Sequence, residues 1–470
     1  MFFRQLYDER LAQASYFVAC QATGEAVVID PNRDVEQYLE LAERHGFRLA
    51  AVTETHIHAD FVSGARELAQ RTGAKLFLSG AGPREWQYEY AEKEGATLLE
   101  DGASFRIGKI LFEALHTPGH TPEHLSFVLK DEARASEPVG IFTGDFVFVG
   151  DVGRPDLLER AAGVVGAAEE GARQLFRSLA KFRSLPDYVQ VWPGHGAGSA
   201  CGRALGAMPQ STVGYERRFN WAFKIEDEAE FVRAVLDGQP DSPPYFAVMK
   251  RVNKRGPTPV AELAPVEKLG FESLSGALGR WIIADTRRAE DYARRHIPGT
   301  INLPFNGSFV TWAGWLLPYD AKIGLIIGDD AAGRAVRALR LIGLDQIAGF
   351  WSPEVIEEWE ARGGRLHKIE RLSADRAQQL IEKGEVHVLD VRREDERARG
   401  QIAGSLHLPL GELIKGEAEL PTDKPLLVHC QTGTRSALAV GLLSARGMDH
   451  LIDLEGGFAA WERKVNEGKN

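Results

Sequence analysis

Histidine and aspartate residues in the first half of the chain have the types and the spacing of a metal site. Imidazole nitrogens and carboxylate oxygens bind first-row transition metals, and alternation along an extended segment sends His56, His58 and Asp60 to the same side. One such pattern could arise by chance, whereas several in one half of a chain indicate a metal centre. The motifs are THIHAD (55–60), TPGHT (117–121), TGD (143–145) and PGHG (193–196).

A cysteine in a short polar loop is the second candidate for chemistry. The segment HCQTGTRSA (429–437) places Cys430 directly after the apolar run PLLV and ahead of a helix. The loop amides, the helix N-terminus and Arg435 would all stabilise a thiolate at this position. A thiolate held in this way can accept a second sulfur atom and carry it as a persulfide. The residues that would form the cradle are Gln431, Thr432, Gly433 and Thr434.

Short β-branched runs separated by glycine-rich turns predict the elements that position the metal residues. Each candidate metal residue follows the end of such a run, so the ligands would gather in loops at one edge of a sheet. We predict helices at 35–46 and 63–73 and a linker at 251–259, where Pro and Gly accompany basic residues. The predicted strands are 25–31, 48–56, 74–80, 109–121, 124–130, 139–145 and 188–196.

The second half of the chain contains an internal repeat. Residues 285–304 align without gaps on 390–409, with nine of 20 positions identical, and 325–343 match 426–447. Each copy is expected to run strand, loop, strand, six-residue loop and helix, as a small α/β unit with a parallel sheet. Aligning Arg334 with Arg435 places Asp329 where the second copy has its cysteine, and a carboxylate cannot form a persulfide.

Length and composition limit the classes of protein. The chain has 470 residues, 44% of them hydrophobic and 26% charged, which predicts about three domains. No apolar run approaches the roughly 20 residues of a membrane span, and charges interrupt the first residues, so we expect a cytoplasmic protein. A net charge of -11 disfavours nucleic acid and anionic membranes as partners. Three scattered cysteines exclude a disulfide framework.

The four histidine and aspartate motifs, in this order, resemble those of the metallo-β-lactamase superfamily. The resemblance covers residues 1 to about 225 and implies an α/β fold, an αββα sandwich, in a first domain that we place at 1–250. Hydrolytic members of that family read HxHxDH, where the final histidine helps to hold a second metal. This chain has Phe61 in that place, and phenylalanine cannot bind a metal. The substitution favours a site for one metal.

The branch of that family with a single metal includes the persulfide dioxygenases, and the resemblance implies one Fe(II) per chain. Its ligands would be His56, His120 and Asp145. Two histidines and a carboxylate leave three positions of an octahedral iron open, enough for a persulfide sulfur and dioxygen. Tetrahedral zinc would keep one open position, suited to a water nucleophile, and zinc stays the alternative metal. Three further residues would orient ligands or substrate, with direct ligation left open: His58, Asp60 and His195.

Two more residues are candidates for the substrate pocket of the first domain. Cys201 follows His195 by six residues, so its thiol could face the substrate and exchange sulfur, or could be a small buried side chain. Arg154 follows the TGD strand and could meet an anionic thiol carrier, with a surface salt bridge as the other interpretation.

The thiol loop and the repeated frame D-x-R, I-x-G-(T/S), L-P resemble the rhodanese sulfurtransferases. The resemblance is strong in the second copy, which we place at 372–470, and weaker in the first, placed at 257–366. It implies that Cys430 carries sulfur and that the loop runs to Arg435. Because Asp329 takes the position of the nucleophile, the first copy is expected to be an inactive module.

Together these resemblances predict an enzyme of sulfur metabolism. The first domain would oxidise a low-molecular-weight thiol persulfide with O2 to sulfite, and Cys430 would form or use thiosulfate. Persulfides of glutathione, coenzyme A, bacillithiol or cysteine all fit, and a homo-oligomer is left open. One alternative is a zinc thioester hydrolase similar to glyoxalase II with an accessory rhodanese. Another is a binding module that relays sulfur to a second protein.

Overall fold

The chain divides into two compact units, each described here by itself. The computed structural model describes residues 1–157, 159, 166–203, 205–239 and 242–467, so residues 468–470 of the predicted third domain lie outside the described part. The first unit comprises residues 1–264 and 340–343, and the second comprises 265–339 and 344–470. None of the helices in the described ranges combines the length and apolar character needed to cross a membrane.

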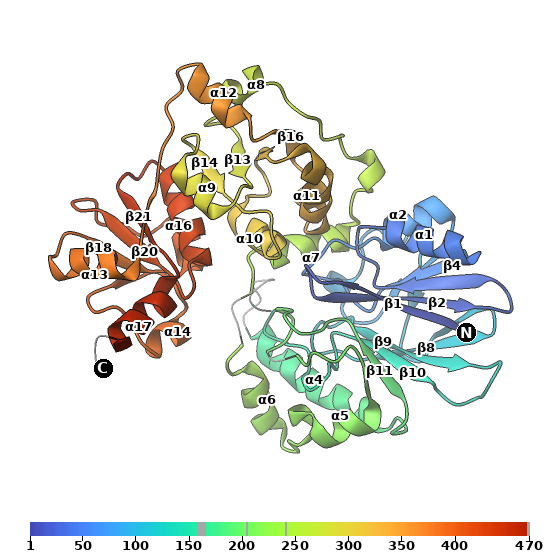
Figure 1. The fold of residues 1–470 in the computed structure, drawn as a ribbon. Coiled ribbons are helices and arrows are strands. Elements are labelled where there is room, and N and C mark those ends of the chain that lie inside the picture. Colours follow the sequence, from blue (N-terminus) through green and yellow to red (C-terminus); the bar gives the residue numbers. More distant parts are fainter. Residues whose placement is uncertain (158, 160–165, 204, 240–241, 468–470) are drawn as a thin grey trace. The chain divides into compact units, whose positions relative to one another are not determined.

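The first unit contains two six-stranded sheets (Figure 1). One has the order β1-β2-β3-β4-β5-β6, antiparallel from β1 to β3 and parallel from β3 to β6. The other has the order β12-β11-β10-β9-β8-β7, in which only the pair β10 and β11 is parallel among the described strands. The first sheet consists of β1 (Phe2–Asp8), β2 (Gln13–Cys20), β3 (Glu25–Ile29), β4 (Arg48–Thr53), β5 (Lys75–Ser79) and β6 (Thr97–Leu99). The second consists of β7 (Ser104–Ile107), β8 (Ile110–His116), β9 (Leu125–Asp131), β10 (Gly140–Gly144), β11 (Gln190–Pro193) and β12 (Ser211–Thr212).

Helices cover the outer face of each sheet, which confirms the predicted αββα sandwich. Aromatic side chains from both sheets, such as Phe112 and Phe142, fill the space between them. Helices α1 and α2 pack on the first sheet and α4 to α6 on the second, so β2 and β10 are buried along their whole length. The helices of this unit are α1 (Glu36–His45), α2 (Ala65–Thr72), α4 (Ala167–Arg183), α5 (Val213–Phe219), α6 (Glu228–Leu236) and α7 (Phe246–Arg255).

Helix α7 overturns part of the predicted linker. Residues 251–255, expected to be irregular, form the second half of this helix, and Asn253 on it is buried. The helix ends at Gly256, whose positive φ angle breaks the helical pattern before Pro257. The basic residues that suggested a linker lie on its exposed side, while Met249 and Asn253 face inward. A basic, solvated helix face has the composition of a linker, which explains the error.

The second unit contains two parallel sheets, as the internal repeat predicts. The middle sheet has the order β14-β13-β15-β16 and the C-terminal sheet the order β17-β21-β20-β18-β19. The strands are β13 (Ile282–Asp285), β14 (Thr300–Asn302), β15 (Ile323–Ile326), β16 (Ile347–Trp351), β17 (Glu370–Leu372), β18 (His387–Asp390), β19 (Leu406–His407), β20 (Leu426–His429) and β21 (Leu451–Leu454). The helices are α8 (Glu272–Ala277), α9 (Ala289–Arg294), α10 (Phe309–Leu316), α11 (Asp329–Leu341), α12 (Val355–Ala361), α13 (Ala374–Glu382), α14 (Glu394–Ala398), α15 (Leu410–Lys415), α16 (Thr434–Ala445) and α17 (Gly457–Glu467).

The two copies of the repeat differ where the six-residue loop was expected. In the second copy, residues 430–433 separate β20 from α16, whereas in the first copy α11 begins at Asp329, three residues after β15 ends. The predicted six-residue loop is therefore wrong for the first copy, where only 327 and 328 intervene, and two residues too long for the second, because Thr434 and Arg435 already belong to α16. Asp329 and Asp330 suit a helix N-terminus and the following alanines favour helix, while Gly433, with φ of 99°, interrupts helix in the second copy.

The middle and C-terminal sheets share a buried contact through His296. Its Nε2 lies 3.1 Å from Oγ of Ser444 on α16, and its Nδ1 donates to the carbonyl oxygen of Tyr292 at 3.0 Å. The imidazole is fully buried and stacks on the ring of Tyr292. Burial is the main cause that lowers the pKa of His296, to about 4.

This depressed pKa predicts an acid sensitivity of the second unit. The folded state favours the neutral form of His296 more than the unfolded state does. Neutral His296 therefore contributes fully to the free energy of unfolding above the unfolded pKa near 6.5, and this contribution is lost as the pH falls toward 4. Between pH 7 and pH 5 the free energy of unfolding should fall by about 2 kcal/mol from this group. Urea unfolding of the full chain should show this loss, and His296→Gln should lack it. His450→Asn, at an exposed histidine, is the control, and equal pH dependence in wild type and His296→Gln would contradict the assignment.

Candidate functional site

Three of the predicted metal residues meet at one edge of the two sheets. His56 follows β4, His120 lies in the loop after β8, and Asp145 directly follows β10. All three side chains are buried, and one ligand atom from each lies within 4.8 Å of the others. The carboxylate oxygen Oδ2 of Asp145 is 3.5 Å from Nε2 of His120 and 3.9 Å from Nε2 of His56. This is the donor set of a two-histidine, one-carboxylate metal centre.

The unpartnered atoms of this group show that it fits a cation. Within the described part of the chain, Nε2 of His56 and both carboxylate oxygens of Asp145 are buried without a hydrogen-bond partner. A buried carboxylate that lacks hydrogen bonds is costly, and a bound metal ion would remove that cost. Burial raises the pKa of Asp145, but His195 and then His120 outweigh it, so the pKa lies below its ordinary value and the carboxylate is ionised.

Each ligand imidazole is oriented by a hydrogen bond at its other nitrogen. Thr55 gives its hydroxyl proton to Asp30 at 2.9 Å, so its oxygen accepts from Nδ1 of His56 at 3.0 Å. Nδ1 of His120 donates to the carbonyl oxygen of Arg154 at 3.0 Å. In both rings the lone pair is thereby left on Nε2, which faces Asp145. Burial lowers the pKa of both imidazoles, which keeps them neutral and able to bind a metal.

His58 lies beside the ligands and makes a different contact. Its Nε2 is 3.1 Å from Oδ1 of Asp30, while Nδ1 has no partner among the described residues. Burial alone would lower the pKa of His58, but the Asp30 carboxylate outweighs burial and raises it to about 9. Asp30 also accepts from the backbone N–H of Thr55 at 2.6 Å, so one carboxylate fixes the start of the THIHAD loop.

Asp60, His195 and Cys201 form a second buried group whose ligand atoms lie within 4.8 Å of one another. Nε2 of His195 is 3.3 Å from Asp60 and 3.5 Å from Oδ1 of Asp145, so this group adjoins the first. Nδ1 of His195 donates to the carbonyl oxygen of Ala12 at 2.9 Å. Burial, with Asp60 and Asp145 nearby, raises the pKa of the Cys201 thiol well above its usual value. The sequence placed Asp60 and His195 near the metal and named Cys201 as a pocket candidate, and the structure brings all three together with the Cys201 thiol buried.

Arg154 is fully buried rather than at the surface. Its guanidinium donates two hydrogen bonds to Asp156, at 2.7 and 2.6 Å, and a third to the carbonyl oxygen of Ala200 at 3.0 Å. Its own carbonyl oxygen holds His120. The predicted salt bridge is present but lies in the interior. Through it, Arg154 connects the loop that contains Cys201 with the backbone carbonyl that binds His120.

Asn253 on α7 fixes the loop that contains Phe61, a role that no local sequence motif indicates. Its Nδ2 donates to the carbonyl oxygens of His58 and Phe61 at 2.8 and 2.7 Å, and its Oδ1 accepts from the backbone N–H of Ser63 at 2.9 Å. Phe61 is fully buried, with its ring centre 4.4 Å from that of His58. The phenylalanine therefore packs beside a metal-site imidazole where a further ligand would otherwise stand.

His124 and Glu123 are two further site residues that sequence reasoning missed. Nε2 of His124 accepts from the backbone N–H of Asp145 at 3.2 Å, so Nδ1 carries the proton and donates to Oγ1 of Thr117 at 2.8 Å. Burial lowers the pKa of His124 to about 3. Glu123 accepts from the backbone N–H of Ile57 at 2.9 Å. Their position directly after TPGHT was the signal available in the sequence.

The thiol loop of the second unit holds Cys430 at the end of a buried strand and donates a backbone N–H to its sulfur. Cys430 is buried directly after β20, and the backbone N–H of Gly433 donates to its Sγ at 3.1 Å. The carbonyl oxygens of Cys430 and Gln431 are bound by the first amides of α17, those of Phe458 at 2.7 Å and Ala459 at 3.0 Å. Because these carbonyls are tied back to α17, the amide dipoles of the loop present their positive ends to the sulfur.

Arg435 and Gln431 are each held by a neighbour of the loop. Arg435, in the first turn of α16, makes two hydrogen bonds of 2.6 Å to Glu396. Oε1 of Gln431 accepts from Arg392 at 3.1 Å, and Arg392 is paired with Asp390. Asp285 and Arg287 repeat the last pair in the first copy. Both pairs fix the turns that follow β18 and β13, because each arginine also donates to a backbone carbonyl eight residues further on, that of Gly400 or that of Arg295.

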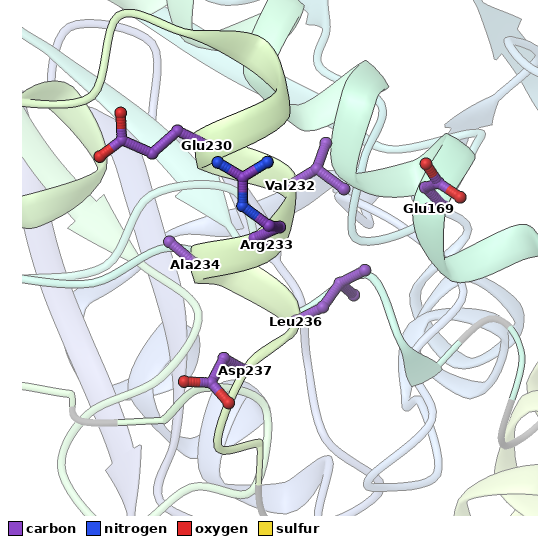
Figure 2. A pocket seen from close by; sticks show the side chains of 7 residues that line it. All are labelled: Glu169, Glu230, Val232, Arg233, Ala234, Leu236 and Asp237. Carbon is purple, nitrogen blue, oxygen red and sulfur yellow. The ribbon is translucent and has the colours of Figure 1, made fainter.

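An open hollow along α6 contains none of the metal-site or thiol-loop residues (Figure 2). Its lining combines carboxylates, one guanidinium and aliphatic side chains, and the labelled side chains in Figure 2 do not converge on a common point. The hollow is lined by Glu169, Glu230, Val232, Arg233, Ala234, Leu236 and Asp237. The candidate chemistry therefore lies at the sheet edge and at the thiol loop.

Known proteins share both parts of this architecture. The model of the metallo-beta-lactamase superfamily matches residues 8–195, and that of the rhodanese-like domain matches 373–464. A crystal structure described as a metallo-beta-lactamase from Staphylococcus aureus subsp. aureus COL is 42% identical, with a TM-score of 0.68, and the match covers 75% of this chain and 99% of that one. The chain belongs to the metallo-beta-lactamase superfamily. Its C-terminal part is a rhodanese-like domain with a parallel sheet.

Two curated relatives of the metallo-beta-lactamase part differ in the chemistry that their names state. The mitochondrial persulfide dioxygenase ETHE1 of Homo sapiens is 29% identical over 239 residues, covering 49% of this chain and 78% of that protein. The probable polyketide biosynthesis zinc-dependent hydrolase BaeB of Bacillus velezensis is 25% identical over 227 residues, covering 48% of this chain and 88% of that protein. Superfamily membership therefore supports metal binding and leaves the metal open between iron and zinc.

The contacts of Asn253 predict that it controls metal affinity. Asn253→Ala would leave two buried carbonyl oxygens and one N–H without partners and loosen the loop that presents His56. We expect metal affinity to fall about 10- to 100-fold, as for other residues that orient ligands. Competition with a chromophoric chelator measures the change, and Arg251→Ala, on the exposed side of the same helix, is the control. Unchanged metal affinity in Asn253→Ala would show that the loop keeps its geometry without the hydrogen bonds of Asn253.

Proposed function

We propose that the first domain oxidises low-molecular-weight thiol persulfides with O2 at a single Fe(II), and that Cys430 carries sulfur between thiosulfate and thiols. The observation that carries the proposal is the buried set of His56, His120 and Asp145, with Phe61 where a further ligand would be needed. A thiol in an anion-binding loop on the same chain supports it, because both sites would then handle sulfane sulfur.

The ligands of the iron would be Nε2 of His56, Nε2 of His120 and a carboxylate oxygen of Asp145. A ferrous ion held in this way supplies open coordination positions and redox chemistry with dioxygen. The chain's own residues keep the site dry and oriented: Thr55 and the carbonyl of Arg154 fix the two imidazoles, and His124 fixes the Asp145 backbone. Asp60, His58 and His195 line the same space and can bind or release protons of the substrate.

The overall reaction consumes one persulfide, one O2 and one water, and releases one thiol, one sulfite and two protons. At Cys430 the thiolate attacks the outer sulfur of thiosulfate, the S–S bond breaks, and sulfite leaves with the electron pair while Cys430 holds the persulfide. The reverse transfer, from a persulfide to sulfite, makes thiosulfate. Sulfite is thus common to both reactions, which gives a reason for placing the two sites on one chain.

Relatives support this chemistry without fixing it. The human persulfide dioxygenase shares 29% identity with the first domain, and the rhodanese-like match includes Cys430. We assign the dioxygenase domain to 1–250, a degenerate rhodanese-like domain to 257–366 and the active rhodanese domain to 372–470. The degeneracy of the middle domain is supported by Asp329, which aligns with Cys430 and whose carboxylate, bound by Lys268 and Ser352, cannot form a persulfide.

A zinc-dependent thioester hydrolase is the second candidate function. The observation that favours it is the second group, Asp60, His195 and Cys201, which could hold a second metal next to the first. The zinc-dependent hydrolase among the relatives is in line with this possibility. Such a centre would activate water rather than dioxygen.

Oxygen uptake separates the two functions. We expect the iron-loaded chain to consume one O2 and release one sulfite per persulfide across a panel of glutathione, coenzyme A, bacillithiol and cysteine persulfides. The zinc-loaded chain should consume none. Asp145→Asn should lose metal and activity together, because it removes a charged ligand. Thioester hydrolysis by the zinc form, with no O2 uptake by the iron form, would establish the hydrolase instead.

Replacement of the loop thiol tests the second half of the proposal. Cys430→Ser should reduce thiosulfate sulfurtransfer at least about 100-fold, because the nucleophilic sulfur is lost, while O2 uptake with a persulfide continues. Cys20→Ser, at a thiol buried between the two sheets, is the matched control and should retain both activities. Sulfurtransfer at the wild-type rate in Cys430→Ser would remove Cys430 from the mechanism.

A further inference from the structure

The ion pair between Arg435 and Glu396 has a consequence for the charge that Cys430 meets. Arg435 makes two parallel hydrogen bonds of 2.6 Å to the two carboxylate oxygens of Glu396, and both side chains are largely buried. A bidentate contact of this kind occupies the face of a guanidinium that binds sulfonate or carboxylate anions. Arg435, the one cationic residue of the segment 430–435, is therefore already neutralised by Glu396.

Arg435 lies in the first turn of α16, two residues beyond Gly433, whose backbone N–H donates to Sγ of Cys430 at 3.1 Å. Its pKa is raised first by the hydrogen bonds to Glu396, and the Cys430 thiol is a further cause of the increase. Glu396 is itself held in place, since it accepts from the backbone N–H of Arg393 at 3.0 Å at the start of α14. The carboxylate therefore sits on Arg435 in a defined position rather than as a mobile surface charge.

The other guanidinium groups beside the loop are also paired. Arg392, which contacts Gln431, forms an ion pair with Asp390 at 2.8 Å, and Arg397 lies 3.5 Å from the same carboxylate. Nε2 of His429 is 3.8 Å from Asp390, and burial lowers the pKa of His429 to about 4, so this imidazole is neutral. Asp390 carries one negative charge and is shared by two guanidinium groups, so it offsets their charge only in part, and releasing Arg435 would add a further unit of positive charge beside the loop.

The first copy of the repeat provides an internal comparison. The gapless alignment of 285–304 on 390–409 places Asp291 where the second copy has Glu396, and the separate match of 325–343 with 426–447 places Arg334 where it has Arg435. Asp291 lies 3.3 Å from Arg294, and Arg334 lies over the ring of Phe305. No ion pair joins Asp291 to Arg334 in the described part of that copy. The pair is present in the copy that has the thiol and absent from the copy that lacks it.

We infer that Glu396 sets the substrate specificity of Cys430 by occupying Arg435, so that the loop favours the singly charged persulfide group of a thiol carrier over the dianion thiosulfate. The inference rests on the proposed sulfurtransfer at Cys430. A sulfonate that is to bind Arg435 must displace Glu396, whereas a persulfide can deliver its outer sulfur to the thiolate without that contact. Both transfers break one S–S bond and form another, and the electron pair leaves with sulfite or with the thiolate of the carrier.

Alkylation of Cys430 tests the charge effect without any sulfur chemistry. The Cys430 thiolate attacks the same carbon in iodoacetate and in iodoacetamide and displaces iodide, so the ratio of the two rates cancels the thiolate fraction and reports the local charge. In Glu396→Gln the ratio of iodoacetate to iodoacetamide should rise about three- to tenfold, as expected for one unit charge about 6 Å away at an effective dielectric of about 40 to 80. Mass spectrometry of the peptide containing Cys430 separates it from Cys20 and Cys201.

Asp395→Asn is the matched control, because it removes the same charge from the neighbouring position, where Asp395 pairs with Arg393 and Arg399 instead. Its ratio should equal that of wild type. The KM for thiosulfate should fall in Glu396→Gln by about the square of the change seen with iodoacetate, since thiosulfate carries two charges. A wild-type or reduced alkylation ratio in Glu396→Gln would overturn the inference. If the alkylation ratio rises in Glu396→Gln but the protein transfers no sulfur from thiosulfate, the effect of Glu396 on the charge at Cys430 is supported and the proposed sulfurtransfer is rejected.

If Glu396→Gln does not fold, Arg435→Gln provides the second test. Removing a guanidinium that Glu396 already neutralises leaves the carboxylate unpaired near Cys430, so the alkylation ratio should fall below that of wild type. The double variant Glu396→Gln with Arg435→Gln removes both charges and should return the ratio to the wild-type value. A double variant that stays as low as Arg435→Gln would overturn the inference.

Discussion

The carboxylate of Asp145 is an ionised group held in the protein interior, and much of the first domain serves to compensate for it. Neither oxygen has a hydrogen-bond partner among the described residues, and three imidazoles surround it. A buried charge of this kind is destabilising unless a counter-ion is present. A metal ion supplies that counter-charge, so metal binding and stability of this sheet edge are coupled, as they are in other metal sites.

The same constraint explains why the residues that support the site come from distant parts of the chain. Asp30, Thr55, His124, Arg154 and Asn253 contribute hydrogen bonds that hold ligands or the loop backbone. An imidazole binds a metal well only in one tautomer and orientation, and each of these contacts selects that tautomer or fixes the backbone that carries the ring. In the second unit the tie between α17 and the loop carbonyls performs a comparable task for Cys430.

Much of the fold and the core of the site could be predicted from the sequence, because hydrophobic alternation and the four motifs are local signals. All seven strands predicted for the first domain are present, with shifts of a few residues at their ends. Asn253 could not be predicted, since its role depends on α7 packing against the THIHAD loop almost 200 residues earlier. The helix that begins at Asp329 was missed because alignment with the second copy implied a loop, while the local sequence favours helix. Glu396 lies within the aligned repeat segment 390–409, but the sequence does not indicate that Arg435 is its partner, because only the fold brings the two side chains together.

The central claim is that one metal ion is bound by nitrogen and oxygen ligands alone. X-ray absorption spectroscopy of the iron-loaded full chain tests it most directly, because it counts scatterers by distance and element. We expect the iron to be surrounded at bonding distance by nitrogen and oxygen alone, from His56, His120 and Asp145. A sulfur scatterer at about 2.3 Å, contributed by Cys201, or a second metal at about 3.5 to 4 Å, would contradict it.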